Sequence, residues 1–171
     1  MTNAPTTNAP MTNAPEQKID ITSDSCRYDG KTSRMIYLGH VVVTDHPKAT
    51  LHCEQLTVDV PTAGGDPTNI VAETNVVVDY LDEKGQTNHV TADKAVYAYG
   101  VVNTVTNQTL TFTRFTPDNP MPKVANPQFT ATGEPLVYDL IARQFSGGNF
   151  HMEFNVKSGA GTNASPFNIL K

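Results

Sequence analysis

Several features are scarce in this sequence, and each scarcity excludes a class of protein. The 171 residues include no Trp, and 12 Lys and Arg are outnumbered by 17 Asp and Glu, which gives a net charge of -5. This balance leaves no basic surface for a nucleic-acid backbone, so neither DNA nor RNA is an expected partner. The chain also has no run of about 18 apolar residues, the length that a membrane-spanning helix needs.

Motifs for metal binding and catalysis are missing as well. The two cysteines, Cys26 and Cys53, form no Cys-x-x-Cys pair, and the five histidines show no zinc-ligand spacing. The chain has no Gly-x-Ser-x-Gly elbow, phosphate-binding loop or His-Glu-x-x-His motif. We therefore predict no catalytic residue, no metal and no cofactor, and we expect a protein that is not an enzyme.

The residues that are abundant favour β-structure. The sequence contains 23 Thr and 17 Val against 8 Leu, and no segment has a clear 3.6-residue apolar period. With 38% hydrophobic residues, a single domain has material for only a thin core. We therefore predict an all-β protein built as an elongated stack of strands.

Four acidic residues mark a repeat along the chain. Asp24, Glu54, Asp93 and Glu134 each stand where an alternating apolar pattern changes phase, at spacings of 30, 39 and 41 residues. Because side chains alternate between the two faces of a strand, an apolar set stays on one face across a one-residue slip only at a bulge or bend. Each acid is therefore predicted to mark a corner of a stacked-repeat fold. Their regular recurrence favours this reading over a converging pair of glycosidase carboxylates.

A second alternating strand completes each repeat. These strands include residues 36–43, 74–78, 105–112 and 145–152, and the third lacks the glycine that the first and last contain. A stack of this kind has one apolar and one polar face. If its two walls meet, the interior is only a core. If the walls splay, acyl chains suit the space, because each buried CH₂ contributes on the order of 0.8 kcal/mol.

The inward phase of these patterns gives the predicted lining of the interior. Its members are Ile36, Leu38, Val41, Val43, Leu56, Val58, Val76, Val78, Tyr97, Leu110, Phe112, Leu136, Tyr138 and Phe150. An ordinary core residue is the alternative interpretation at each position, and Tyr97 and Tyr138 suit the rim, where a hydroxyl stays wet. Both cysteines also take the inward phase, which predicts either two buried thiols or a disulfide between neighbouring rungs.

The first residues are of low complexity. Thr-Asn-Ala-Pro occurs three times between Thr2 and Pro15, and such a segment cannot form a core. We predict a disordered tether over residues 1–17, a folded domain over 18–156 and a flexible tail over 157–171. We expect an exported, mature fragment whose signal or anchor lay upstream of the tether, and a cytosolic protein with a polar tail is the alternative.

The corner phrases resemble a known family. Ser23 to Tyr28, Ile36 to Val43, Leu51 to Val58 and Val90 to Tyr97 are similar to the OstA-like domain of the lipopolysaccharide-transport proteins, in the LptA/LptC superfamily. Four phrases in register make the resemblance specific, and it extends from about residue 19 to residue 155. The LptA-type branch matches best. The third repeat without its glycine, and the long loops at 61–67 and 116–127, leave a membrane-tethered LptC-type relative as the alternative.

This resemblance implies both a fold and a function. The implied fold is an antiparallel β-jellyroll, shaped like a folded taco, with four stacked repeats and about sixteen short strands. The implied function is that of a periplasmic, non-enzymatic carrier, which holds lipopolysaccharide acyl chains in a hydrophobic groove and bridges the inner and outer membranes by end-to-end assembly. A structural β-solenoid scaffold without a lipid ligand is the alternative function.

The resemblance also implies partners. These are lipopolysaccharide or a related lipid, other bridge proteins that share the fold, and further copies of the chain bound head to tail. Open ends of a strand stack expose unpaired backbone groups that template another strand. The first rung, residues 19–28, and the last, residues 144–154, are the predicted edges for such pairing.

Overall fold

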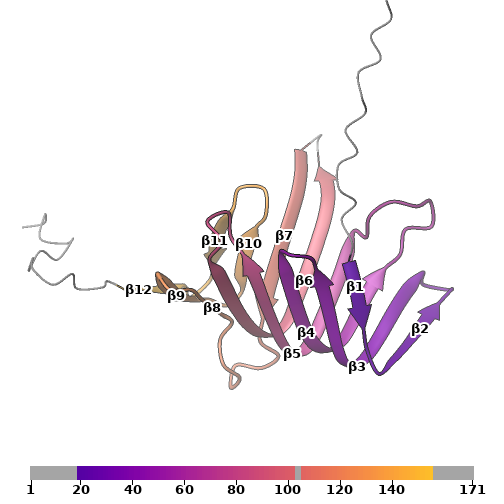
Figure 1. Ribbon diagram of the computed structural model, residues 1–171, viewed down its shortest axis with the longest axis horizontal. Coiled ribbons are helices and arrows are strands. Elements are labelled where there is room, and N and C mark those ends of the chain that lie inside the picture. Colours follow the sequence, from indigo (N-terminus) through magenta and orange to yellow (C-terminus); the bar gives the residue numbers. More distant parts are fainter. Residues whose placement is uncertain (1–18, 103–104, 156–171) are drawn as a thin grey trace, which may run out of the picture.

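The computed structural model describes residues 19–102 and 105–155, which form twelve β-strands (Figure 1). The strands are β1 (Ile19–Thr22), β2 (Ser25–Asp29), β3 (Arg34–Asp45), β4 (Ala49–Asp59), β5 (Asn69–Leu81), β6 (Thr87–Val102), β7 (Val105–Thr113), β8 (Lys123–Ala125), β9 (Phe129–Thr132), β10 (Leu136–Asp139), β11 (Gln144–Gly147) and β12 (His151–Phe154). No helix among these residues is long and apolar enough to cross a membrane. The predicted tether over 1–17 and tail over 157–171 lie outside the described residues.

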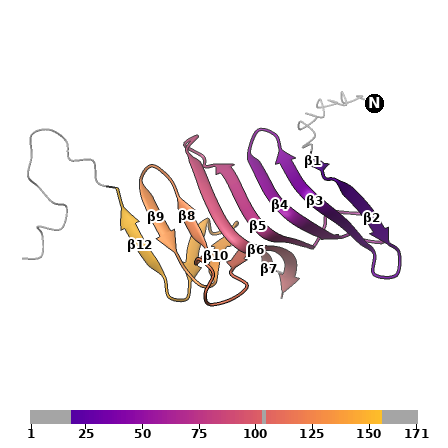
Figure 2. The ribbon, with the colours of Figure 1, turned by 90° about the horizontal axis from the view of Figure 1, so that it is seen from below.

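The described strands join into one antiparallel sheet. Its main order is β1-β3-β4-β5-β6-β7-β10-β11, while β2 pairs with β3, β8 with β6 and β9, and β12 with β9. Seen from below, β3, β4, β5, β6, β8, β9 and β12 follow one another in a row (Figure 2). The predicted all-β antiparallel architecture is thereby confirmed.

The sheet has two walls, because four long strands bend and contribute one half to each wall. The β1 wall contains β1, residues 41–45, 49–52, 76–81 and 87–92 of the long strands, and β8, β9 and β12. The β2 wall contains β2, residues 34–38, 55–59, 69–73 and 94–102 of the long strands, and β7, β10 and β11. Each wall thus has eight strand segments. The resemblance implied about sixteen short strands, and the described residues form twelve, because four long strands continue through their bends.

Backbone bulges produce the bends. Relative to its neighbour, β3 has an extra residue between Leu38 and Val41, and β5 has one between Glu73 and Val76. The residues at these points, Gly39 and His40 in β3 and Thr74 and Asn75 in β5, have positive φ angles. Such angles are the usual mark of a bulge that re-aims a strand. The line of bulges across the sheet is called the corner below.

The four acids lie at the corner, as predicted. Asp24 is in the link between β1 and β2, Glu54 and Asp93 lie beside the bulges, and Glu134 is in the link between β9 and β10. The Asp24 carboxylate lies 2.8 Å from Nδ1 of His40, and the Asp24 N–H donates to the Gly39 carbonyl at 2.9 Å. A Cβ on Gly39 would lie 2.3 Å from Oδ2 of Asp24. Only glycine therefore fits this bulge.

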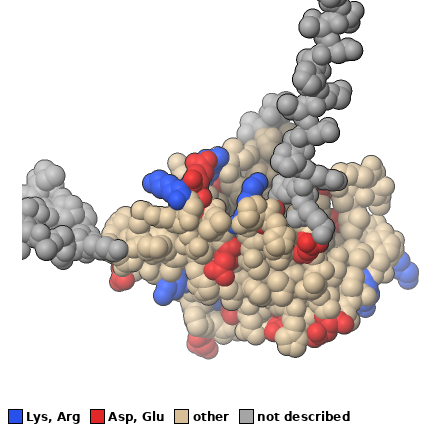
Figure 3. Space-filling view, in the orientation of Figure 1, with Lys and Arg blue, Asp and Glu red and all other residues tan. Residues whose placement is uncertain are grey.

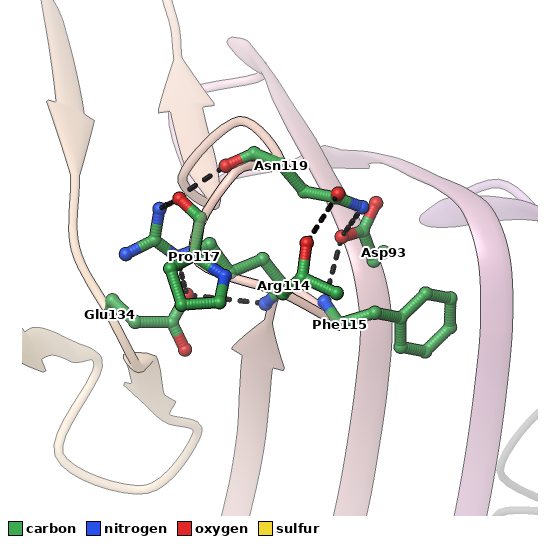
Figure 4. Close-up of polar contacts among 7 residues, drawn as sticks. Asp93, Arg114, Phe115, Pro117, Asn119 and Glu134 are labelled. Carbon is green, nitrogen blue, oxygen red and sulfur yellow. Dashed lines mark hydrogen bonds and ion pairs between the residues drawn. The ribbon is translucent and has the colours of Figure 1, made fainter.

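The third repeat turns its corner with a loop instead of a bent strand. β7 belongs to the β2 wall and β8 to the β1 wall, and residues 114–122 connect them. Asp93 accepts the Phe115 N–H at 2.8 Å and the Asn119 side-chain amide at 2.6 Å. Glu134 accepts the Arg114 N–H at 3.2 Å, and the Arg114 guanidinium also donates to the carbonyls of the loop (Figure 4). The third corner is thus held by hydrogen bonds from a loop to two corner acids, in place of the glycine bulge of the first.

The core lies between the walls, next to the corner. Its buried members come from both walls and are Val41, Cys53, Leu56, Val58, Ala72, Val76, Val78, Val90, Ala95, Phe112, Val124, Ala131 and Leu136. Most are small or β-branched, which suits the pleated face of a half-buried strand. The core is therefore narrow, as the composition predicts.

Candidate functional site

The inner faces of the two walls are the candidate site, because apolar side chains continue along them beyond the buried core. The inward residues of β6 show this clearly. Ala95, beside the corner, is 2% exposed, and Tyr97 is half-buried. Tyr99 is 36% exposed and Val101 59% exposed. The inner surface thus changes from closed to open along one strand.

The open end of this gradient is called the mouth, and it is the edge of the walls farthest from the corner. Ile19 and Phe154 on the β1 wall, and Tyr99 and Val101 on the β2 wall, are exposed apolar side chains on the inner faces. Exposed apolar residues on the inner faces of both walls suggest a ligand or partner surface. Charged side chains lie scattered over the face seen in Figure 3 and form no single basic patch there.

Most of the predicted lining residues do lie on the inner faces. Strand alternation and pairing place the following there: Val41, Val43, Leu56, Val58, Val76, Val78, Tyr97, Leu110, Phe112, Leu136 and Tyr138. Phe150 lies instead in the link between β11 and β12, where its ring packs near Gly133. A role of these residues in binding a ligand stays a prediction.

Two predicted lining residues, Ile36 and Leu38, are on the wrong face. Their neighbour Tyr37 pairs with the buried Leu56, so Tyr37 points inward and both flanking residues point outward. The β3 bulge at Gly39 and His40 reverses the phase, so that Val41 points inward again. The prediction had carried a single phase through residues 36–43.

Several inner-face residues escaped the prediction. They are Met35, Tyr37, Ile70, Tyr80, Val90, Val124, Phe129 and Phe145. The phase of Met35 and Tyr37 was available in the sequence, because both alternate correctly with the glycine taken as a phase break. Tyr80 continues the inward phase of Val76 and Val78, so the sequence carried its signal as well, whereas the contact that its ring makes depends on how the walls meet.

The walls touch through aromatic rings at the end of the interior near β10. Tyr80 of the β1 wall and Tyr138 of the β2 wall have ring centroids 5.9 Å apart, and Tyr138 and Phe145 have centroids 4.6 Å apart. Burial raises the pKa of Tyr80 well above its usual value, and burial likewise raises the pKa of Tyr138. Beside the rings, Arg143 in the β10–β11 turn pairs with Glu83 in the β5–β6 turn.

Two small cavities lie along the β1 wall, one at its turns and one at the corner. A cavity of about 180 Å³ lies at the mouth and includes Lys48, Tyr80 and Leu81 in its lining. A cavity of about 290 Å³ lies at the corner and includes Val76, Asp93 and Met121. Both linings include outward-facing residues, such as Leu81 and Thr91, so these volumes do not measure the space between the walls.

The two cysteines have different surroundings. Both are free thiols; Cys53 is buried in the core and Cys26 is exposed. Burial raises the pKa of the Cys53 thiol to about 11. The prediction of a buried side chain was wrong for Cys26, because β2 pairs only with β3 and its side chains lie at the edge of the sheet.

Three of the five histidines, His40, His89 and His151, lie next to carboxylates on the surface. Nδ1 of His40 lies 2.8 Å from Asp24, and Nδ1 of His89 lies 2.7 Å from Asp79. The hydrogen bond that the protonated His40 ring donates to the Asp24 carboxylate raises the pKa of His40. Among residues 19–102 and 105–155, no group of three His, Cys, Asp or Glu side chains could hold a metal ion.

The family is shown by a match to the family described as "LptA/(LptD N-terminal domain) LPS transport protein", which covers residues 20–140. This range extends from β1 through the end of β10. The chain belongs to this lipopolysaccharide-transport family. The matched range contains all four corner acids and every predicted lining residue except Phe150. No curated protein matches the chain.

A solved structure has a similar fold to this family member. It is the crystal structure of LptH, described as the LptA-homologous periplasmic component of the lipopolysaccharide-transport device of Pseudomonas aeruginosa. The TM-score is 0.62 at 16% sequence identity, and the match covers 82% of this chain and 96% of LptH. At this identity the likeness establishes the jellyroll fold, which confirms the predicted fold class.

Proposed function

We propose that this member of the LptA/LptD family is a periplasmic, non-enzymatic carrier of lipopolysaccharide, which holds acyl chains between its two walls. The observation that carries the proposal is the gradient along β6, where inward apolar residues pass from 2% exposed at Ala95 to 59% exposed at Val101. Burial of an acyl chain against this water-exposed apolar surface is favourable, by on the order of 0.8 kcal/mol for each CH₂. Transport of this kind needs shielding from water and no bond-making step.

The two ends of the sheet support assembly into a bridge. Among the described residues, β1 and β2 at one end each pair with β3 alone, β11 at the other end pairs with β10 alone, and β12 pairs with β9 alone. Such edges expose backbone groups that can pair with a strand of another molecule. We propose that copies of the chain, or other bridge proteins of the same fold, join there head to tail in a contact that propagates.

A displacement experiment tests the carrier function. A fluorescent fatty-acid probe should gain intensity on binding the protein, and lipopolysaccharide should displace it. If lipopolysaccharide does not displace the probe at any concentration, the result would favour the alternative, a structural scaffold without a lipid ligand. The closed core at the corner would suit such a scaffold. Light scattering over a range of protein concentrations tests assembly, and a strict monomer at high concentration would contradict the bridge.

A further inference from the structure

The contact between Tyr80 and Tyr138 joins the two walls away from the corner. Tyr80 pairs with Ala49 and Asn88 in the β1 wall, and Tyr138 pairs with Leu110 and Phe145 in the β2 wall. Their rings meet with centroids 5.9 Å apart. Everywhere along the corner the walls are continuous through the backbone, whereas here only side chains connect them.

An ion pair reinforces the same contact. Glu83 lies in the turn that ends β5, three residues after Tyr80, and Arg143 lies in the turn between β10 and β11. The two side chains bind each other. The other ion pairs among the described residues lie within one wall or at the corner. Two turns that are 60 residues apart in the sequence are thus held together across the interior.

We propose that Tyr80, Glu83, Tyr138 and Arg143 form a clasp that closes the mouth near β10 and opens to admit acyl chains. This inference rests on the proposed carrier function. Its basis is that turns 60 residues apart, one on each wall, are joined here by a ring contact and an ion pair and, among the described residues, by no backbone pairing. Opening the clasp breaks side-chain contacts and no backbone pairing between the described strands.

The contacts of the clasp suit a reversible closure. Both side chains of the ion pair are well exposed, at 61% and 74%, and exposed pairs contribute little because water screens them. The tyrosine pair adds an edge-on or tilted ring contact, which is modest as well. Opening would expose the rings to the acyl chains themselves, so that the lost ring contact is replaced by contact with lipid.

Covalent closure of the clasp is the decisive experiment. In a Cys26→Ser background, Glu83→Cys and Arg143→Cys are joined with a short bis-maleimide. The linked protein should take up the fluorescent fatty-acid probe at least about tenfold more slowly, because uptake falls in proportion to the open population. The matched control is the same variant with both thiols capped by a mono-maleimide, which carries the same substitutions without the link.

The outcomes separate the clasp from the carrier function. Probe uptake by the unmodified protein, together with equal uptake by the linked and capped forms, would overturn the clasp alone. Absence of uptake by the unmodified protein would overturn the carrier function and the clasp with it.

A charge exchange tests the ion pair without a cross-link. Glu83→Arg and Arg143→Glu each place like charges across the mouth, and each should speed uptake by up to about fivefold, the range expected for an exposed pair. The double exchange restores the attraction and should return the rate to that of the unmodified protein. Equal rates in all four proteins, at equal unfolding midpoints, would remove the ion pair from the clasp.

Discussion

The corner and the mouth of this protein are made from the same kinds of residue but have opposite environments. At the corner, Val90 and Phe112 are 1% and 2% exposed. The corner acids there accept hydrogen bonds from backbone N–H groups. At the mouth, Val101 and Phe154 are 59% and 63% exposed on the same inner faces. Burial at the corner stabilises the fold, while the wet apolar residues of the mouth contribute little to it. The difference separates the part that folds the chain from the part proposed to hold its ligand.

The largest expected effect is at a buried aromatic ring of the corner region. Phe112→Ala should lower the free energy of unfolding by about 3–5 kcal/mol, because it removes a large side chain and leaves a cavity. The matched control is Phe115→Ala, three residues away and 50% exposed, which should change it by less than about 1 kcal/mol. Urea unfolding followed by circular dichroism measures both. Equal losses would contradict the role given to burial of the Phe112 ring.

The next effect concerns the glycine of the β3 bulge. Gly39→Ala should cost about 2–3 kcal/mol, because φ is 78° and the new methyl group would lie 2.3 Å from the Asp24 carboxylate. Gly64→Ala is the control, since Gly64 has a φ of 80° and no atom within 4 Å of the built Cβ. The difference between the two unfolding free energies therefore isolates the contact with Asp24. If the two variants lose the same stability, the tight fit at the corner is wrong.

A smaller effect is expected at the acid that holds the third corner. Glu134→Gln removes the charge that the Arg114 guanidinium faces at 3.4 Å in a half-buried site, and it should cost about 1 kcal/mol. Glu153→Gln breaks an exposed pair with His151 and should cost less than about 0.5 kcal/mol. Thermal unfolding of both variants provides the comparison. A larger loss at Glu153 than at Glu134 would contradict the role given to the corner acids.

The smallest effect is a pH dependence at His40. Because Asp24 raises the pKa of His40 above 6.5, the protonated form stabilises the folded state. This contribution is fully present below pH 6.5 and is lost as the pH rises through the folded-state pKa. His40→Gln should slightly reduce the change of the unfolding midpoint with pH between about pH 6 and 8. An NMR titration with a His40 pKa at or below 6.5 would refute the expectation.

The sequence predicted the fold class and the corners because both depend on local patterns. Phase slips at Asp24, Glu54, Asp93 and Glu134 record where a strand must bend to keep its apolar side chains inward. The faces of Ile36 and Leu38 were wrong because the bulge at Gly39, not the acid alone, resets the phase of β3. Gly39 was the sequence signal that this assignment needed, because a glycine inside a strand often marks a bulge.

The clasp could not be predicted from the sequence. Tyr80 and Tyr138 come from different walls, and their contact depends on the twist of the whole sheet, which no local pattern encodes. Tyr138 was expected at the rim with its hydroxyl wet, and Tyr80 was not singled out at all. The exposure gradient along β6 is also a property of the assembled walls, since Ala95, Tyr99 and Val101 look alike as inward positions of one strand.

The central claim, that lipid lies against the inner faces at the mouth, has a direct test on β6. A photoreactive amino acid is placed at Tyr99, which points inward, or at its neighbour Ala98, which is exposed on the outer face. Irradiation with lipopolysaccharide should give a cross-linked product from position 99 and little from position 98. Equal cross-linking at the two positions, or a product from position 98 alone, would contradict the account.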